Sequence, residues 1–254
     1  MPADRDILSL AGVAHNFGGL SVLRNVTFTV PHRGLVGLIG PNGSGKTTLF
    51  NAITGFLTPQ GGEIRYDGRA LRAETIQERS RAGMVRTFQT PKVFENMTVL
   101  ENIMVGCCKV TRTSMVEDML RLGRATRELR NIRRIAEAAC DKFNLRAMSD
   151  LPASILTAGQ RRILEIARAI VGNPLLLLLD EPSSGLNSDE IENLRRWIRQ
   201  LRDEGMSILL VSHDMGLMTV SDVIHVLYFG EIIASGSMED IKQNARVREV
   251  YLGA

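Results

Sequence analysis

The chain has 254 residues, with 31 Lys and Arg against 28 Asp and Glu, and 44% of the residues are hydrophobic. This composition excludes a disordered, fibrous or membrane-spanning protein and predicts one large domain or one core with an inserted lobe. A net charge of +3 gives no field that would draw the chain onto nucleic acid, so we expect no nucleic-acid partner.

The cysteines and the apolar runs bear on location. Cys107, Cys108 and Cys140 are odd in number and lack a Cys or His partner at metal-ligand spacing, which favours a reduced, cytosolic setting and gives them no role. The densest apolar run, Leu175 to Leu179, is far shorter than the ~18 residues that cross a bilayer. Charges in residues 1–12 are not typical of a signal peptide. We therefore expect membrane attachment through partners.

The first third of the chain is predicted to consist mainly of strands. Apolar and polar residues alternate, turn residues such as Gly18-Gly19 separate the runs, and one run is wholly apolar. A helix is expected to begin at Lys46. The expected strands cover residues 7–17, 26–30, 35–39, 63–66 and 84–88.

The middle of the chain, from about residue 98 to 143, changes to a helical pattern. Apolar side chains recur at spacings of mostly three and four residues, which is typical of amphipathic helices, and Gly123 is a candidate break between two of them. We expect a helical lobe inserted into a sheet. The apolar stripe consists of Met115, Met119, Leu122, Leu129, Ile132, Ala136, Ala139 and Phe143.

The last part of the chain alternates helices with strands. Helices are expected over 159–171 and 188–203, and strands over 175–180 and 207–212. A hairpin is expected over 223–234, followed by short terminal helices. Strands that alternate with helices predict a parallel sheet.

The glycine-rich segment from residue 40 fits the P-loop pattern, which is a glycine, four free positions, then Gly-Lys and a hydroxyl residue. The loop leaves a short apolar strand and opens a helix, so its backbone N–H groups would converge on a phosphate chain. Lys46 would bridge the β- and γ-phosphates, and Thr47 would offer its hydroxyl to Mg²⁺. The alternative interpretation is a Gly-rich turn that matches the P-loop pattern by chance. The candidate nucleotide-binding residues here are Gly40, Pro41, Asn42, Gly43, Ser44, Gly45, Lys46, Thr47 and Thr48.

Asp180 and Glu181 follow the apolar strand that starts at Leu175 and supply the second half of such a site. Adjacent carboxylates repel each other, so different partners are expected. Asp180 would be held by the magnesium shell, and Glu181 would polarise the water that attacks the γ-phosphate. Taken alone, the same residues could be the polar end of a core strand.

Together with these two motifs, four further motifs make the chain similar to the ATP-binding subunits of ABC transporters over almost its whole length. All of them occur in the order that is typical of this family. The four further motifs are the Q-loop Thr87–Gln89, the signature Leu156–Gln160, the D-loop Ser184–Asn187 and the switch histidine within Ser212–Asp214. The resemblance implies an α/β fold with a P-loop NTPase (RecA-like) core, an N-terminal antiparallel β subdomain and an inserted α-helical subdomain. Residues 1–254 would form a single ABC ATPase domain. Its core and β subdomain would cover approximately 1–90 and 160–254, and its helical subdomain approximately 91–159.

The resemblance also implies roles for single residues. Gln89 would reach Mg²⁺ and the attacking water, His213 would contact the γ-phosphate, and Phe17 would stack on adenine. The implied catalytic residues are therefore Glu181, His213 and Gln89, and the implied metal-site residues are Thr47, Gln89 and Asp180. The signature residues Thr157, Ala158, Gly159 and Gln160 would contact ATP held by another chain.

The chain departs from the family pattern at two positions. The signature has Thr157 where Ser is usual, and the D-loop has Asn187 where Asp is usual. Thr157 keeps a hydroxyl and Gly159 keeps a bare backbone, so we expect the phosphate contact to survive. Asn187 loses a charge, which leaves its cross-subunit role open.

Strings such as Asn16–Leu20, Arg86–Gln89 and Tyr251–Gly253 resemble the branched-chain amino-acid and amide uptake systems. This branch implies a second ATPase subunit in a heterodimer, with a homodimer possible in isolation. It further implies two permeases, an external solute-binding protein, ATP with Mg²⁺, and a peripheral place on the cytoplasmic face of the inner membrane.

Several alternatives stay open. Urea-uptake and lipopolysaccharide-export ATPases share several of these strings, a soluble ABC ATPase that acts on nucleic acid would belong to another class, and a P-loop kinase would lack the signature and the switch histidine. An arginine stripe in the helical lobe is either a solvated helix face or a contact for acidic lipid or a permease loop. It consists of Arg121, Arg124, Arg127, Arg130 and Arg133.

Overall fold

The computed structural model describes residues 6–107 and 122–252, without the side chains of 122–126 and 252. The chain divides into two compact units. The first unit contains the described residues up to Arg86, Leu175–Ser184 and the chain from Ile191 onward, and the second unit contains Thr87–Pro174 and Gly185–Glu190. Cys108, Met115, Met119, Arg121 and Gly253, which the sequence analysis named, lie outside the described residues.

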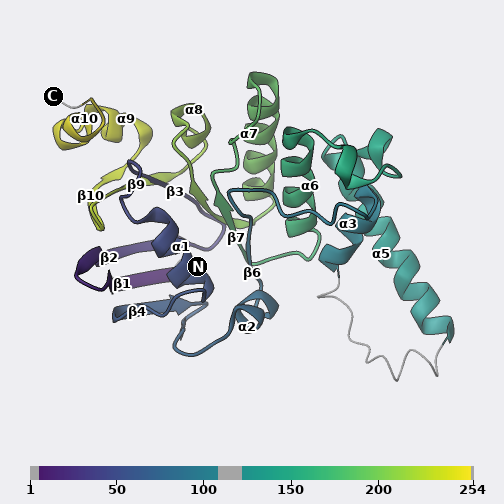
Figure 1. Cartoon of the computed structure of the whole chain (residues 1–254), viewed down its shortest axis with the longest axis horizontal. Coiled ribbons are helices and arrows are strands. Elements are labelled where there is room, and N and C mark those ends of the chain that lie inside the picture. Colours follow the sequence, from purple (N-terminus) through teal and green to yellow (C-terminus); the bar gives the residue numbers. More distant parts are fainter. Residues whose placement is uncertain (1–5, 108–121, 253–254) are drawn as a thin grey trace. The chain divides into compact units, whose positions relative to one another are not determined.

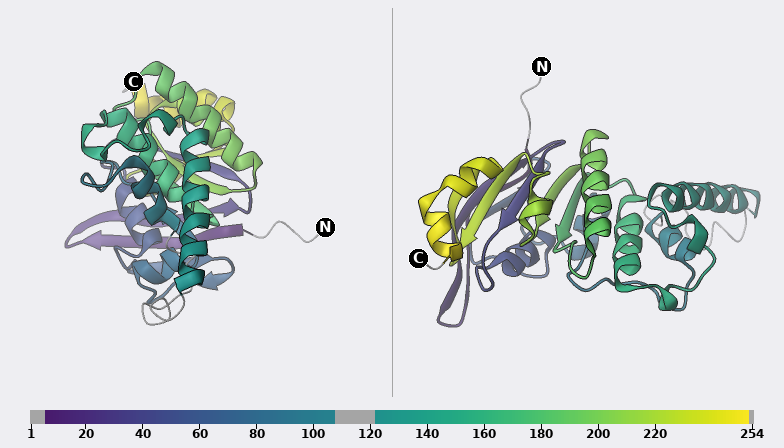
Figure 2. Two further views of the ribbon diagram at one scale, coloured as in Figure 1. Left: turned by 90° about the vertical axis from the view of Figure 1, so that its right-hand side faces the viewer. Right: turned by 90° about the horizontal axis from the view of Figure 1, so that it is seen from above.

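The first unit contains a small antiparallel sheet with the strand order β2-β1-β4-β5. Its two long strands form the hairpin seen in Figure 2. Leu8 and Leu10 alternate inward from β1, and Val13 is buried after a shift in register. The strands are β1 (Asp6–Phe17), β2 (Leu20–Pro31), β4 (Gly61–Tyr66) and β5 (Arg69–Ala70).

A second sheet of the same unit has the order β10-β9-β3-β8-β7-β6, and all its neighbours are parallel except β10 and β9. Every residue of β3, β7 and β8 is buried, which explains their unbroken apolar runs. The strands are β3 (Leu35–Ile39), β6 (Met84–Arg86), β7 (Leu176–Asp180), β8 (Ser207–Val211), β9 (Val223–Tyr228) and β10 (Glu231–Gly236).

The helices of the first unit cover these sheets (Figure 1). The buried side chains of α1, including Leu49, Phe50 and Ile53, join apolar residues of both sheets in one hydrophobic core. This packing fixes the loop between β3 and α1. The helices are α1 (Lys46–Thr54), α2 (Ile76–Arg81), α7 (Ser188–Asp203), α8 (Met215–Met218), α9 (Met238–Gln243) and α10 (Ala245–Leu252), and the first turn of α7 belongs to the second unit.

The second unit combines helices with an irregular segment over residues 87–97. It contains α3 (Val99–Gly106), α5 (Leu122–Lys142) and α6 (Ala158–Ile170), with short 3₁₀ turns between α5 and α6. A Cβ at Gly106 would lie 2.2 Å from the carbonyl oxygen of Arg168, so α3 and α6 pack with their backbones close together. The helical unit therefore includes α6, whereas the sequence analysis assigned residues from 160 onward to the core. Gly123 lies in the first turn of α5 and does not interrupt it.

Two expectations for local structure were wrong. The strand expected over 84–88 ends at Arg86, and the six-residue helix α2 was not expected. Cys107 and Cys140 are buried, and burial raises the pKa of the Cys140 thiol to about 11. Among the described residues, no helix is both long enough and apolar enough to span a bilayer.

His225 on β9 makes the stability of the first unit depend on pH. The side chain is buried against Phe28, its Nδ1 lies 2.7 Å from the hydroxyl of Ser235, and burial lowers its pKa from 6.5 to about 4. The native state thus binds a proton less readily than the unfolded chain. The stabilisation is complete above pH 6.5 and is lost as the pH falls towards 4. The pKa difference of roughly 2.5 corresponds to at most about 3 kcal/mol.

We expect His225→Asn, which keeps an acceptor for Ser235, to flatten this dependence. Urea unfolding at pH 7.5 and at pH 4.5 gives the free energy of unfolding of both proteins. The native chain should lose more stability between these pH values than the variant, by about 1–3 kcal/mol. Equal losses would contradict the assignment.

Candidate functional site

The loop that joins β3 to α1 has a backbone that only glycine allows at two points. Gly45 is the N-cap of α1 with φ 107°, and no side chain caps the helix. A Cβ at Gly40 would lie 2.1 Å from the carbonyl oxygen of Leu227. The first N–H groups of α1 therefore keep their hydrogen-bonding capacity for an anion at the helix N-terminus.

Two polar side chains of this loop are poised for a ligand. Lys46 Nζ donates to the carbonyl oxygens of Gly40 at 2.7 Å and Pro41 at 2.9 Å, so the amine folds over its own loop. Burial lowers the pKa of Lys46, and the nearby carboxylates Glu181 and Asp180 oppose that effect. Ser44 is buried, and its hydroxyl has no hydrogen-bond partner among the described residues. A polyphosphate would satisfy both groups.

The other P-loop residues line the same helix start. Gly45 is buried, Pro41, Lys46 and Thr48 are half-buried, and Asn42, Gly43 and Thr47 are exposed. The exposed Thr47 hydroxyl on the first turn of α1 is a hard oxygen donor of the kind that Mg²⁺ prefers.

Asp180, the last residue of β7, is held by an arginine that sequence reasoning missed. Arg86 Nη2 lies 2.7 Å from Asp180 Oδ2, and both side chains are buried. Arg86 also donates to Asn51 at 2.7 Å and lies over the ring of Phe50, both on α1. The arginine thus ties the strand that carries the carboxylate to the helix that follows the phosphate loop. No local sequence pattern could have predicted this contact, because Arg86 and Asp180 are 94 positions apart in the sequence.

Glu181 and His213 meet where the neighbouring strands β7 and β8 end. Glu181 Oε2 lies 2.7 Å from His213 Nδ1 and accepts the His213 backbone N–H at 3.2 Å. Glu181 has φ 47°, in the left-handed region that residues other than glycine seldom adopt, and its N–H donates to Val211. Strain of this kind is concentrated at functional sites. The geometry presents a buried carboxylate beside an exposed imidazole.

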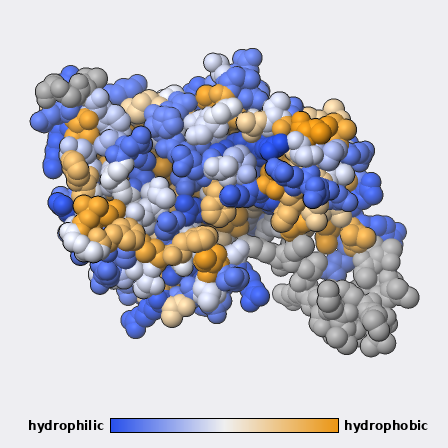
Figure 3. Space-filling model, viewed as in Figure 1, coloured by the Kyte–Doolittle hydropathy of each residue, from blue (hydrophilic) through white to orange (hydrophobic). Residues whose placement is uncertain are grey.

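Phe17 at the end of β1 is 52% exposed and makes an edge contact with the ring of His15, with 4.7 Å between the centroids. Leu20 and Phe229 are exposed apolar residues of the same unit. Figure 3 shows hydrophobic surface on the side where β10 and the β1–β2 hairpin lie. An exposed aromatic face can stack on a planar base.

The remaining candidates belong to the second unit. Gln89 is exposed on an irregular loop. Thr157 is the N-cap of α6: its hydroxyl accepts the Gln160 N–H, and Gln160 Oε1 accepts the Thr157 N–H. The hydroxyl hydrogen of Thr157 is still able to donate, and the exposed N-terminus of α6 offers N–H groups to an anion.

Gly159 and Asn187 are connected through Glu190. A Cβ at Gly159 would lie 2.5 Å from Glu190 Oε1. Asn187 and Glu190 exchange two backbone-to-side-chain hydrogen bonds of 2.9 Å at the start of α7. Asn is as good as Asp in such a capping position, so the departure from the family pattern leaves local structure intact.

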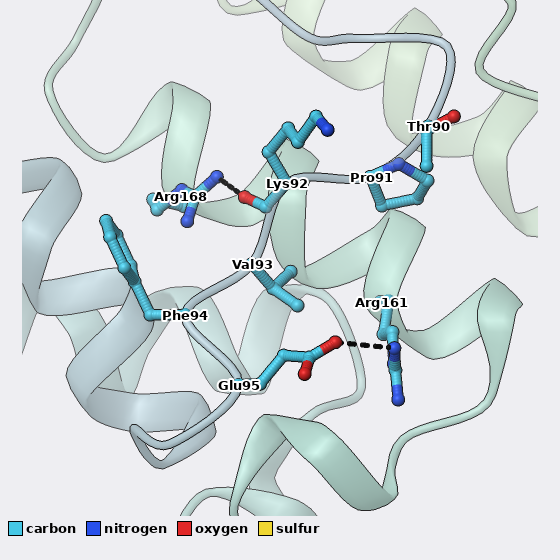
Figure 4. Close-up of a pocket in the computed structure, with 8 residues that line it drawn as sticks. All are labelled: Thr90, Pro91, Lys92, Val93, Phe94, Glu95, Arg161 and Arg168. Atoms are coloured by element: carbon cyan, nitrogen blue, oxygen red, sulfur yellow. Dashed lines mark hydrogen bonds and ion pairs between the residues drawn. The ribbon is translucent and has the colours of Figure 1, made fainter.

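The second unit also contains a pocket of about 470 Å³ (Figure 4). The loop segment 90–95 lines it together with Arg161 and Arg168 of α6. Arg161 pairs with Glu95 at 3.2 Å, and Arg168 lies over the half-exposed ring of Phe94. The pocket is thus lined by an aromatic ring and by several cationic side chains.

Comparisons with known proteins show which families the chain resembles. The sequence profile described as "ABC transporter" matches residues 23–184, and the profile described as "Branched-chain amino acid ATP-binding cassette transporter" matches residues 231–254. The chain is 39% identical to the high-affinity branched-chain amino acid transport ATP-binding protein BraF of Pseudomonas aeruginosa, over 98% of each chain. It is 31% identical to the lipopolysaccharide export system ATP-binding protein LptB of Haemophilus influenzae, over 97% of each.

Among solved structures, the chain is similar to a nucleotide-free ATP-binding cassette from an ABC transporter. The TM-score is 0.83 at 30% identity, and the alignment covers 98% of this chain and 100% of the other.

Proposed function

This chain belongs to the family of ABC transporter ATP-binding proteins, which hydrolyse ATP to power transport, and from that premise we propose that it drives the import of branched-chain amino acids or related amides. The proposal is supported by the site geometry of the first unit in combination with the sequence identity to known transport proteins. The first unit contains a phosphate loop whose Ser44 hydroxyl has no hydrogen-bond partner in the described part of the chain, together with two carboxylates at a strand end and an adjacent histidine. The chain is also 39% identical to a branched-chain amino acid transport ATP-binding protein.

Different residues of the first unit bind the phosphates, activate the water and hold the metal ion in this proposal. The backbone of Gly40–Gly45 and the amine of Lys46 hold the phosphates, and Lys46 exchanges its two carbonyl partners for phosphate oxygens. Glu181 orients the attacking water and accepts its proton, and the imidazole of His213 fixes the glutamate and faces the γ-phosphate. Thr47 and Asp180 would hold Mg²⁺, which supplies charge neutralisation at the β- and γ-oxygens when bound.

A second chain completes the site in this proposal. The chain has one phosphate loop and one signature segment, and the signature forms the exposed N-terminus of α6. If the signature segment faces ATP that is bound to a partner chain, the N–H groups at the start of α6 would contact the γ-phosphate. ATP-binding cassettes dimerise and associate with transmembrane permeases. We propose a heterodimer with a second ATPase, two permeases and an external solute-binding protein.

The pocket around residues 90–95 supports a docking role. Its exposed ring of Phe94 and its cations Lys92 and Arg168 would receive a cytoplasmic segment of a permease. This contact would place the chain as a peripheral subunit on the cytoplasmic face of the inner membrane.

An uptake assay tests the cargo. Deletion of this chain should abolish high-affinity uptake of radiolabelled leucine, isoleucine and valine by the source cells. The native chain should restore it and Glu181→Gln should not. Competition by unlabelled amides or urea ranks the solutes. Unchanged uptake of all three amino acids would contradict the proposal and favour another ABC system, such as urea uptake or lipopolysaccharide export.

Phe17→Ala is expected to weaken ATP binding by roughly tenfold, because base stacking on an aromatic ring contributes about 1–3 kcal/mol. Inorganic tripolyphosphate has no base, so its affinity should stay within twofold. Calorimetric titration of both ligands into both proteins gives the two ratios. An equal loss for both ligands would show that Phe17 supports the fold of the site and does not stack on adenine.

A further inference from the structure

The clearest feature outside the site described above is a buried ion pair on α6. Arg162 and Glu165 are 0% and 3% exposed, and Arg162 Nη1 lies 2.9 Å from Glu165 Oε2. A buried ion pair is stabilising only if further hydrogen bonds satisfy its remaining polar atoms. The partners of these two side chains therefore indicate their purpose.

Those partners are backbone groups of residues 88–92. Glu165 Oε1 accepts the N–H groups of Phe88 at 3.3 Å and Lys92 at 3.1 Å. Arg162 donates to the carbonyl oxygens of Phe88 and Gln89. A turn further along α6, Arg168 donates to the carbonyl oxygen of Lys92, as Figure 4 shows.

The segment from Thr87 to Met97 belongs to neither a helix nor a strand. Its backbone polar groups cannot be satisfied by a regular hydrogen-bond ladder, so they need other partners. Side chains at positions 162, 165 and 168 of α6 supply them, because residues three apart lie on one helix face. We call Arg162 and Glu165, with the backbone bonds they make, the clamp.

We propose that Arg162 and Glu165 are positioning residues for Gln89. The clamp holds the Gln89 carbonyl and the N–H and carbonyl of the preceding residue, so the exposed amide side chain leaves the backbone from a fixed point. This inference rests on the proposed function and on the role in hydrolysis that the resemblance to ABC transporter subunits implies for Gln89. The clamp also sits on the helix that opens with Thr157, so the loop and the signature segment move together.

The clamp further connects Gln89 to the pocket. Lys92 lines the pocket and is bonded through its N–H to Glu165. A segment that docks in the pocket and shifts Lys92 shifts the same carboxylate that holds Phe88. Docking and hydrolysis are thereby coupled through one side chain.

The test uses the double variant Arg162→Met/Glu165→Leu. Replacing both partners with apolar residues of similar volume avoids an unpaired buried charge, so the chain should fold. Steady-state phosphate release with Mg·ATP, in the presence of the partner subunits, should show kcat lower by about tenfold, while the Kd for ATP stays within twofold.

A mutant cycle with Gln89→Ala separates positioning from general damage. If the clamp acts through Gln89, the triple variant has the same kcat as Gln89→Ala alone. Losses that multiply in the triple variant, or an unchanged kcat in the double variant, would overturn the clamp and leave the role of Gln89 intact. A full kcat in Gln89→Ala would instead refute the proposed role of Gln89, and the clamp proposal with it.

Hydrogen exchange gives a second readout that needs no turnover. Amides of a peptide covering 86–94 should be protected in the native chain and should exchange at least tenfold faster in the double variant. Unchanged protection would overturn the proposal. The matched control is Arg146→Met/Asp141→Leu, which removes an exposed ion pair of 3.9 Å in the same unit. It should change neither exchange in 86–94 nor kcat.

Discussion

Replacing Lys46 with alanine is expected to raise the Kd for ATP by at least about 100-fold. The amine now donates to two loop carbonyls, at 2.7 and 2.9 Å, and would exchange them for charged phosphate oxygens. Hydrogen bonds between ionised groups contribute about 1.5–3 kcal/mol each, so the loss of two accounts for this factor. Isothermal titration with Mg·ATP measures the change.

The control for this variant is Lys242→Ala, which removes an exposed lysine on α9. Its Kd should equal that of the native chain. Thermal unfolding of both variants without nucleotide checks that the loop of the Lys46 variant is intact. An unaltered Kd in Lys46→Ala would remove the lysine from the phosphate site.

The second large effect is expected from Glu181→Gln. The amide has the same shape and still reaches His213 Nδ1, which lies 2.7 Å from the carboxylate in the native chain. It loses the negative charge that accepts a proton from water, and general-base catalysis contributes about 10²–10⁴-fold to a rate. ATP should bind with a Kd within about threefold of the native value, while turnover falls at least 100-fold.

Phosphate release at saturating Mg·ATP, with the partner subunits present, measures this loss. Glu239→Gln, an exposed carboxylate on α9, is the matched control and should keep the native rate. Sustained turnover in Glu181→Gln would assign the general base to another group. A parallel loss of binding would show that the substitution disturbs the phosphate loop.

The parts of the site that follow from the sequence are those that local chemistry dictates. The phosphate loop needs glycine at Gly40 and Gly45, since a Cβ at either would meet a neighbouring backbone, and that requirement is visible in the sequence. The apolar runs of β3, β7 and β8 likewise reflect complete burial. The sequence therefore predicted these three strands.

The unexpected helix α2 had a signal that could have revealed it. Thr75 and Glu78 form a capping box, in which each side chain accepts the backbone N–H of the other. This spacing is readable in the sequence as a helix start. The helix is only six residues long, so hydrophobic period alone could not detect it.

The contacts that sequence could not predict join distant positions. Arg86 pairs with Asp180, which lies 94 positions further along the chain. Glu165 accepts the N–H of Phe88, and these two residues are 77 positions apart. The second contact also explains why β6 ends early. Its neighbour pairing stops at Arg86, and the next backbone groups are bound by side chains of α6 in place of a ladder. Only the folded arrangement reveals such partners.

The most direct test of the account is a calorimetric titration of the purified native chain with Mg·ATP. We expect saturable binding of one nucleotide per chain, because the proposed phosphate site of the first unit consists of one helix N-terminus, Lys46 and one carboxylate pair. Heat of dilution alone, at chain and nucleotide concentrations up to the millimolar range, would contradict it.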